Sequence, residues 1–307
     1  MVKVTVTGGC GFIGSHLVER LVDDGHQVTV ADILQPGYGF LDNLKNKGTV
    51  AFRRVDLTGF QAAREAVGDS EWVFHLAGMS HIPLCRLHPL QAIESHYLAT
   101  ANVLEACRLN KTVRKIVFAG TDHIYSPANA EIDEQGGIAP IEIYGLVKAQ
   151  SIQLCKLYHD MYKVPVSVLV SGNVFGERQD GSKVVPIFVK LALKGLPIVV
   201  NGGKQTRDFY HVSNLVNAYL LVADRGEPGE SYNVSGEQEM SVATLANVIV
   251  ALTGSLSKIL IAGYRDDEDD GLRLHLNKDK IKQLRYEEIV GFDDGMRRTV
   301  EWFRKNL

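Results

Sequence analysis

Tyr144 and Lys148 have the residue types and the spacing needed for proton transfer. They stand four residues apart at the start of a predicted helix that extends to about Tyr162, so their side chains lie on one face of it. A lysine ammonium group lowers the pKa of a nearby phenol from its usual value near ~10. A tyrosine held in this way can act as a general base near neutral pH.

Thr121 supplies a third chemical group. It follows the fifth predicted strand, Lys115–Ala119, where its hydroxyl can hydrogen-bond the same substrate oxygen that Tyr144 deprotonates. A Tyr and a Lys at this spacing are also common on helices that have no catalytic role. It is the combination with Thr121 that predicts an active site.

Three glycines near the start of the chain predict where a cofactor binds. After the first predicted strand, Gly8 permits a tight turn, Gly11 lets a pyrophosphate approach the N-terminus of the next helix, and Gly14 lets that helix pack close to the sheet. We predict this helix over residues Phe12 to Asp24. A tight turn alone would also explain the glycines, so the assignment depends on the second strand as well.

The second predicted strand ends in Asp32, the acidic residue expected about 20 residues further on to hydrogen-bond an adenosine ribose. A carboxylate there repels a ribose 2′-phosphate, which favours NAD over NADP. The ends of the third and fourth strands add residues that can bracket an adenine or let a cofactor lie against the backbone. The predicted cofactor-binding residues are Gly8, Gly11, Phe12, Ile13, Gly14, Asp32, Asp56, Leu57, Leu76, Ala77, Gly78, Tyr144 and Lys148.

Short apolar runs alternate with longer amphipathic ones over the first part of the chain. This pattern predicts an α/β fold, a doubly wound Rossmann-type parallel sheet with helices on both faces. The predicted strands are Val2–Val6, Gln27–Ala31, Val50–Val55, Trp72–Leu76, Lys115–Ala119 and Val166–Val170.

After Gly172 the predicted elements become shorter, which indicates a smaller C-terminal α/β lobe over the cleft. We therefore expect a cofactor-binding domain over residues 1–172 and a substrate-binding lobe over 173–307, with the chain crossing between the two. Its predicted elements are a helix at Val184–Leu193, a strand at Ile198–Val200, and helices near Ser213–Arg225, Ser241–Leu252 and Asp294–Lys305. The acidic run Asp266–Asp270 is interpreted as a solvated loop.

Composition excludes several functions. The chain has 307 residues, 45% of them hydrophobic, and a net charge of -3, so it can bury a full core but offers no basic field for nucleic acid. The four cysteines lie far apart, which predicts neither a metal site nor a disulfide framework. No export signal and no membrane span are predicted, and a cytoplasmic location fits best.

These motifs together resemble the extended short-chain dehydrogenases/reductases, of the nucleotide-sugar epimerase/dehydratase kind, over essentially the whole chain. The matching segments are the glycine turn, Asp32, Asp56-Leu57, His75-Leu76-Ala77-Gly78, Thr121, Tyr144 with Lys148, Asn173-Val174-Phe175-Gly176 and Gly202 to Phe209. The resemblance implies that Asn173 hydrogen-bonds the diphosphate or the uracil side of a nucleotide sugar. It also implies that Arg207, with Arg265, pairs with the diphosphate, as a guanidinium does well.

The sequence departs from the family at three places. His96 stands where the family commonly has Asn, and Val170 where it often has Arg. Sugar 4,6-dehydratases typically show Thr-Asp-Glu at the fifth strand, with Asp as the acid and Glu as the base, whereas this chain has Thr121, Asp122 and His123. His123 can serve as base or acid, or simply line the cleft.

The resemblance implies a first step in which Tyr144, assisted by Thr121, takes the proton of the sugar 4-hydroxyl while hydride passes to NAD. We place NAD-dependent 4-epimerisation of a UDP-sugar first, because the dehydratase Glu is missing. A 4,6-type dehydration that uses Asp122 and His123 comes second, and the segment Ser80-His81 resembles a dehydratase. A simple dehydrogenase and a non-catalytic NAD-binding module are further alternatives.

A homodimer is also expected. The helices that carry His88–Asn110 and Tyr144–Tyr162 are long, and apolar residues are spread around more than one face of them: Leu98, Leu104, Leu154 and Leu157. Such helices from two subunits would form a four-helix contact.

Overall fold

A seven-stranded, entirely parallel sheet forms the centre of the larger lobe. The computed structural model describes residues 1–34, 44, 49–126, 128, 130–264 and 273–307, so the predicted loop at Asp266–Asp270 lies outside the described residues. The strand order is β10-β6-β5-β4-β1-β2-β3. The strands are β1 Lys3–Thr7, β2 Gln27–Asp32, β3 Val50–Arg54, β4 Trp72–His75, β5 Lys115–Ala119, β6 Val166–Ser171 and β10 Ser231–Val234.

The order of strands explains where the site lies. From β1 the chain proceeds to β2 and β3 in one direction, and then crosses back to β4, β5 and β6 in the other. The loops that leave β1 and β4 therefore diverge, and a crevice opens at the carboxyl ends of these strands. The six strands predicted for this sheet are present, with ends that differ by at most one residue.

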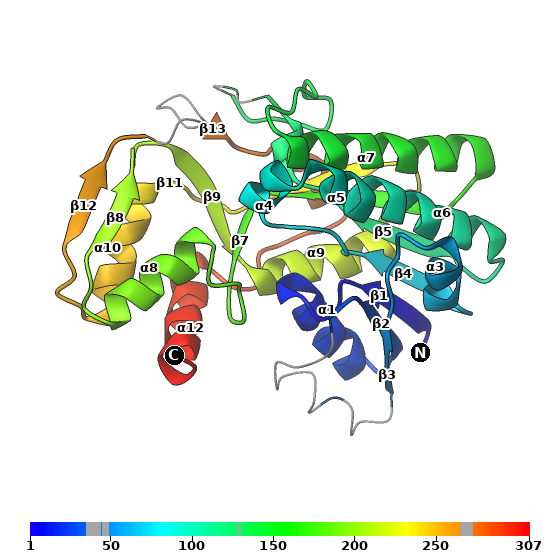
Figure 1. Cartoon of the computed structure of the whole chain (residues 1–307), viewed down its shortest axis with the longest axis horizontal. Helices are drawn as coiled ribbons and strands as arrows, with labels where there is room; N and C mark the ends of the chain where they lie inside the picture. The colour runs from blue at the N-terminus through cyan, green and yellow to red at the C-terminus, as the bar shows by residue number, and fades with distance from the viewer. Residues whose placement is uncertain (35–43, 45–48, 127, 129, 265–272) are drawn as a thin grey trace.

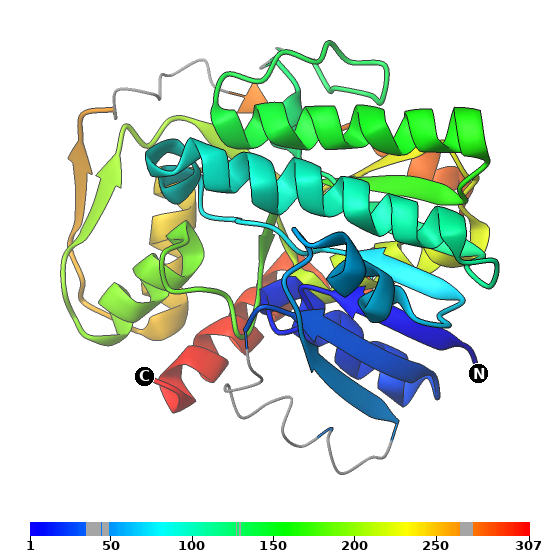
Figure 2. The same cartoon turned by 45° about the vertical axis from the view of Figure 1, so that its right-hand side comes forward.

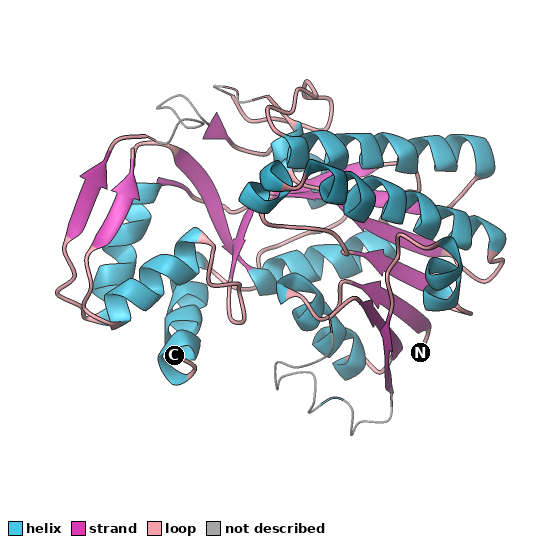
Figure 3. Cartoon of the chain, viewed as in Figure 1, coloured by secondary structure: helices cyan, strands magenta, loops and turns pink. Residues whose placement is uncertain are grey.

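Helices cover both faces of the sheet (Figures 1 and 3). Helices α1 (Phe12–Asp23) and α9 (Val212–Arg225) pack together on one face, over a core that includes Leu17 and Leu215. On the other face lie α3 (Phe60–Val67), α6 (Ala99–Leu109) and α7 (Ile143–Tyr162). The doubly wound fold is thus confirmed.

Residues 88–110 form three consecutive helical segments. Helix α5 (Pro89–Ile93) begins at a proline, which is well suited to the first helical position. A π-helical turn, η1 (Glu94–Leu98), connects it to α6. Such turns are often found at functional sites, and this one carries His96.

The smaller lobe has its own sheets and its own core (Figure 2). Strand β9 (Thr206–His211) is flanked by β11 (Glu239–Ser241) and β13 (Arg273–Leu274) and also pairs with β7 (Asn173–Phe175). A second ribbon pairs β8 (Ile198–Asn201) with β12 (Ile259–Ala262). The helices of this lobe are α8 (Val184–Leu193), α10 (Val242–Thr253) and α12 (Phe292–Lys305); the remaining short helices of the described chain are α4 (Ile82–Leu87), η2 (Asp122–Ile124) and α11 (Asp279–Gln283).

The chain crosses between the two lobes after residue 172. β10 pairs in parallel with β6, and α9 packs on the large sheet, although both come from the second half of the sequence. Of the helices that the structure describes, none has both the length and the apolar character required to span a membrane.

Candidate functional site

The glycine turn after β1 has the geometry of a phosphate cradle. Gly8 has a φ of +71°, and a Cβ atom there would lie 2.7 Å from the backbone nitrogen of Ala77. A Cβ atom at Gly14 would lie 2.2 Å from the carbonyl oxygen of Gly8, so α1 can approach the turn only because residue 14 has no side chain. No described side chain caps the N-terminus of α1, which leaves its first N–H groups available for an anion.

Asp32 lies at the end of β2, beside this turn. Its Oδ2 atom accepts a hydrogen bond of 2.9 Å from the Cys10 N–H, and Oδ1 accepts one of 3.0 Å from the Leu34 N–H. Each carboxylate oxygen has two lone pairs, so both can still accept a bond from a ribose hydroxyl. The position and the charge suit NAD.

One cavity of about 770 Å³ joins the turn to the predicted catalytic residues. Every residue that the sequence predicts for cofactor binding lines it, and so do Thr121, Asp122 and His123. The cavity therefore brings together residues from the ends of β1, β2, β3, β4 and β5 and from the start of α7.

Tyr144, Lys148 and Thr121 meet on the wall of this cavity. Tyr144 is hydrogen-bonded to Thr121, and the Lys148 Nζ atom donates a 2.8 Å bond to the carbonyl oxygen of Ala119. Lys148 is buried, with its ammonium group 4.9 Å from the centre of the Phe118 ring. A pair of hydroxyl groups and a fixed cation thus line the same cavity.

Burial sets the pKa values of this pair. It raises the pKa of Tyr144 well above its usual value, with the Thr121 hydrogen bond acting in the opposite direction. It lowers the pKa of Lys148 to about 8. The lowered tyrosine pKa expected from the sequence is thus not found, because burial of the phenol and the nearby carboxylates Asp122 and Glu142 raise it.

Two histidine rings flank Tyr144. The ring centres of His96 and His123 lie 5.4 Å and 5.9 Å from that of Tyr144, both edge-on. His96 is buried, its Nε2 atom lies 2.9 Å from the Met79 carbonyl oxygen, and burial lowers its pKa to about 3. The neutral His96 ring therefore donates from Nε2 to this carbonyl oxygen. Gly78 leaves room for the ring, because a Cβ atom on residue 78 would lie 2.4 Å from the His96 Nδ1 atom.

Asp122 is held beside Thr121 in the η2 turn. It is 3% exposed, and its Oδ1 atom accepts a 3.3 Å hydrogen bond from the Thr121 hydroxyl. Its Oδ2 atom is buried and has no hydrogen-bond partner among the described residues. An acid with one unengaged oxygen in a cavity wall is suited to protonating a leaving hydroxyl.

The predicted substrate residues are only partly brought together. Ser80 and Asn173 line the cavity, whereas His81 and Arg207 are not among its described lining residues. His81 precedes α4, and Arg207 lies on β9 with its Nη1 atom bonded to the Thr206 carbonyl oxygen at 2.7 Å. Arg265 lies outside the described residues.

Lys183 is a cavity residue that the sequence analysis missed. Its Nζ atom donates a 2.8 Å hydrogen bond to the Ser80 carbonyl oxygen, and burial lowers its pKa. The one sequence signal was a lysine immediately before a predicted helix, which is too common to single out.

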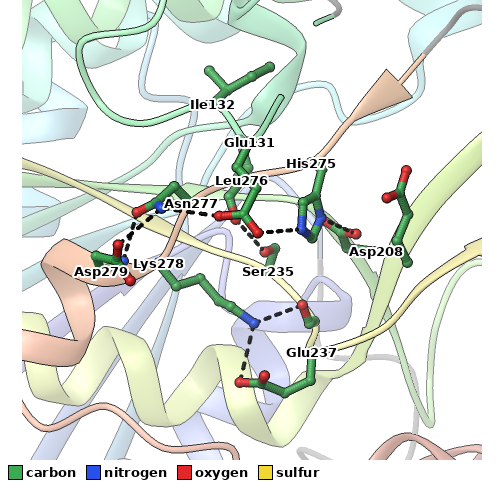
Figure 4. Close-up of polar contacts among 12 residues, drawn as sticks. Glu131, Ile132, Asp208, Ser235, Glu237, His275, Leu276, Asn277, Lys278 and Asp279 are labelled. Carbon is green, nitrogen blue, oxygen red and sulfur yellow. Dashed lines mark hydrogen bonds and ion pairs between the residues drawn. The ribbon is translucent and has the colours of Figure 1, made fainter. Parts of the chain in front are cut away.

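A polar network fixes the segment between η2 and α7 to the smaller lobe (Figure 4). His275 lies between two carboxylates, with Nδ1 at 2.6 Å from Asp208 Oδ1 on β9 and Nε2 at 3.0 Å from Glu131 Oε1. Asn277 donates a further 3.1 Å bond to Glu131. The loop that leads to Tyr144 is thereby tied to the strand that carries Phe209, another cavity residue.

Comparison with known proteins agrees with this geometry. Residues 4–235 match the NAD dependent epimerase/dehydratase family, and the chain belongs to that family. It is 32% identical to a UDP-N-acetyl-alpha-D-glucosaminuronate decarboxylase of Bacillus cytotoxicus, over 99% of this chain and 98% of that protein. It is therefore an NAD-dependent enzyme of a family that includes epimerases, dehydratases and decarboxylases.

Two solved structures are similar over nearly their whole length. The UDP-glucose 4-epimerase of Thermotoga maritima, determined with UDP-glucose, is 28% identical with a TM-score of 0.91 and 99% coverage of both chains. The dTDP-glucose 4,6-dehydratase DesIV of Streptomyces venezuelae, determined with NAD, is 26% identical with a TM-score of 0.92, covering 99% of this chain and 97% of that one. The predicted family and the NAD cofactor are confirmed.

Proposed function

We propose that this enzyme oxidises carbon 4 of a nucleotide sugar and returns the hydride to the same molecule. Tyr144 takes the proton of the 4-hydroxyl, Thr121 holds the oxygen in line, and the Lys148 cation favours the phenolate. Bound NAD supplies the hydride acceptor and, later, the hydride donor. The observation that carries the proposal is the meeting of these three residues with the glycine turn in one cavity.

We propose 4,6-dehydration as the overall reaction. Its support is Asp122, whose buried Oδ2 atom is unengaged among the described residues and which lines the cavity next to Thr121. A carbonyl at carbon 4 acidifies the hydrogen on carbon 5, and Asp122 would protonate the 6-hydroxyl as it leaves. His123 lines the cavity and would take the carbon 5 proton.

4-Epimerisation, which the sequence analysis placed first, is the second candidate. It is favoured by the absence of the dehydratase Glu, since His123 holds that position. In that reaction the keto sugar turns in the cavity and takes the hydride back on its other face.

Mass spectrometry of the products from a panel of UDP-, dTDP- and GDP-sugars separates these reactions. A product lighter by one water supports dehydration, and a product of unchanged mass with a new retention time supports epimerisation. We expect UDP-sugars to react first. With Asp122→Asn, dehydration should stall and reduced NAD should accumulate, whereas epimerisation should be little affected.

We also propose a homodimer built on α6 and α7, which lie side by side in Figures 1 and 2. Of the apolar residues that suggested it, Leu104 is buried and Leu154 packs against the core, while Leu98 and Leu157 are exposed. Exposed apolar residues near them on α7 are Met161 and Tyr162.

A further inference from the structure

We propose that the side-chain amide of Gln179 binds a hydrogen-bond donor of the nucleotide sugar, a hydroxyl or an N–H group, and so selects which nucleotide sugars the enzyme accepts. The inference rests on the proposed function, because it concerns the substrate of the same cavity. Gln179 would determine specificity and take no part in proton or hydride transfer. Two independent observations support it: the hydrogen bonding of the amide, and the backbone turn that holds it.

The amide of Gln179 is satisfied at one end only. Gln179 is among the residues that line the cavity, and its Nε2 atom donates a 2.7 Å hydrogen bond to the carbonyl oxygen of Val174. Because a carbonyl oxygen can only accept, this contact fixes which end of the amide is the nitrogen. The Oε1 atom is buried and has no hydrogen-bond partner among the described residues. A buried acceptor without a partner in the wall of a ligand cavity is explained when the ligand supplies the donor.

The turn that leads to Gln179 has an unusual backbone conformation. Of the described residues other than glycine, three have a positive φ, and one of them is Arg178, at +67°. The other two, Lys163 and Arg285, follow the ends of helices α7 and α11, where this conformation is ordinary. Arg178 follows no helix. A backbone held in this region away from helix ends is typical of ligand sites and requires contacts that enforce it.

Side chains from two other elements enforce this turn. The Arg178 guanidinium group is hydrogen-bonded to Glu19 and lies 3.0 Å from the Nδ1 atom of His16, both on α1. The Nε2 atom of His16 lies 2.9 Å from the carbonyl oxygen of Glu177. The Glu177 carboxylate in turn lies 2.9 Å from the Nε2 atom of His211, at the end of β9. The position of Gln179 is therefore fixed by the protein itself, as preorganised binding requires.

The chemistry of an amide oxygen limits what Gln179 can bind. It accepts hydrogen bonds and repels oxygens that carry only lone pairs, so the diphosphate is not its partner. The donors of a nucleotide sugar are the hydroxyls of the sugar and the ribose, an acetamido N–H where present, and the N–H of the base. NAD also carries donors, but the predicted cofactor residues come from the ends of β1 to β4 and from α1 and α7. Gln179 lies between β7 and α8, in the segment that begins the smaller lobe, so we assign the donor to the substrate.

The test compares a nucleotide sugar with analogues that each lack one donor. The parent is UDP-glucose, or the sugar of the panel that binds most tightly. The analogues lack the 2-, 3-, 4- or 6-hydroxyl of the sugar or one ribose hydroxyl, or carry an N3-methylated base. Affinity for the NAD-loaded protein is measured by isothermal titration in the Tyr144→Phe background, so that turnover does not disturb the titration.

For one donor, the protein with Gln179 should bind the parent at least about tenfold more tightly than the analogue. Adding Gln179→Met, which keeps the length of the side chain and removes the acceptor, should bring this ratio to about 1. The ratios for the other donors should stay unchanged. Affinity for NAD alone should also stay unchanged.

Gln205→Met is the matched control. The Gln205 amide is buried, its Oε1 atom accepts a 2.7 Å bond from the Gly203 N–H, and its Nε2 atom donates a 2.9 Å bond to the Asn201 carbonyl oxygen. Gln205 lies outside the described cavity lining. Methionine at this position should lower the free energy of unfolding and leave every ratio unchanged. A purely structural role of Gln179 predicts that same pattern for Gln179→Met.

The outcomes separate this proposal from the proposed function. Ratios that are all near 1 with Gln179 in place, or that are all unchanged by Gln179→Met, contradict the role of Gln179 while the binding of the nucleotide sugar stands. A loss of NAD affinity with unchanged sugar ratios would show that the cofactor supplies the donor, and it also overturns the proposal. If no nucleotide sugar of the panel binds to the NAD-loaded protein, the proposed function itself is wrong.

Discussion

At the scale of single residues, the phenol oxygen of Tyr144 is the atom on which the proposed chemistry depends. Tyr144→Phe removes only this atom, so folding and NAD binding should persist while turnover falls by about 10² to 10⁴. Turnover is measured on the best substrate of the panel, and NAD affinity by fluorescence titration. Near-normal turnover in this variant would rule out Tyr144 as the base.

Two buried histidines make the protein sensitive to acid. Burial lowers the pKa of both His75 and His96 to about 3, below the value of about 6.5 in the unfolded chain. Between these values the unfolded state binds more protons, so the free energy of unfolding falls as pH drops from 6.5 towards 3, by roughly 1.4 kcal/mol per pH unit for each group. Above pH 6.5 neither histidine changes the free energy of unfolding as the pH varies.

Urea unfolding of the wild type and of His96→Asn, each at pH 7 and at pH 5, checks this expectation. The variant has one of the two histidines left, so its loss of stability on acidification should be smaller by about 2 kcal/mol. Equal losses in the two proteins would show that His96 is not held neutral by burial.

At the scale of elements, the approach of α1 to the glycine turn controls cofactor binding. Gly14→Ala would place a methyl group 2.2 Å from the Gly8 carbonyl oxygen, which is backbone and cannot move aside. We expect a loss of about 1–3 kcal/mol in stability and at least a tenfold weaker affinity for NAD. Thermal unfolding and NAD titration measure the two effects.

Gly59→Ala is the matched control for this substitution. Gly59 lies at the start of another helix, immediately before α3, and the nearest atom to a Cβ at residue 59 is 3.7 Å away. Its stability and NAD affinity should stay close to those of the wild type. A similar change in both variants would mean that the close contact at Gly14 is not the cause.

At the scale of the whole molecule, the exposed apolar residues of α6 and α7 decide the oligomeric state that we propose. Leu157 is 51% exposed on α7, so Leu157→Glu should convert a dimer into a monomer in sedimentation at micromolar concentration. Leu256→Glu changes a fully exposed leucine next to α10, in the smaller lobe, and should leave the dimer intact. A monomeric wild type would refute the proposed dimer.

Local signals in the sequence were enough to predict the large sheet, the cofactor turn and the candidate catalytic trio. Apolar runs define the strands of a parallel sheet, glycines define a turn, and residues four apart share a helix face. Each of these signals is contained within a few neighbouring residues, so the sequence alone shows it. For this reason the six predicted strands of the sheet agree with the structure to within one residue at each end, and Asp32, Tyr144 and Lys148 all line the one cavity.

Packing between distant segments determines which groups share the cavity and in what protonation state. Strand β10 was missed because four residues with alternating polarity carry little signal, and it is defined by pairing with β6. Arg178, which precedes the cavity residue Gln179, is held by His16, 162 positions away in the sequence, so no local pattern joins them. The raised pKa of Tyr144 also depends on distant segments. Burial of the phenol raises it, and that burial depends on every segment that packs around the site and on no single motif.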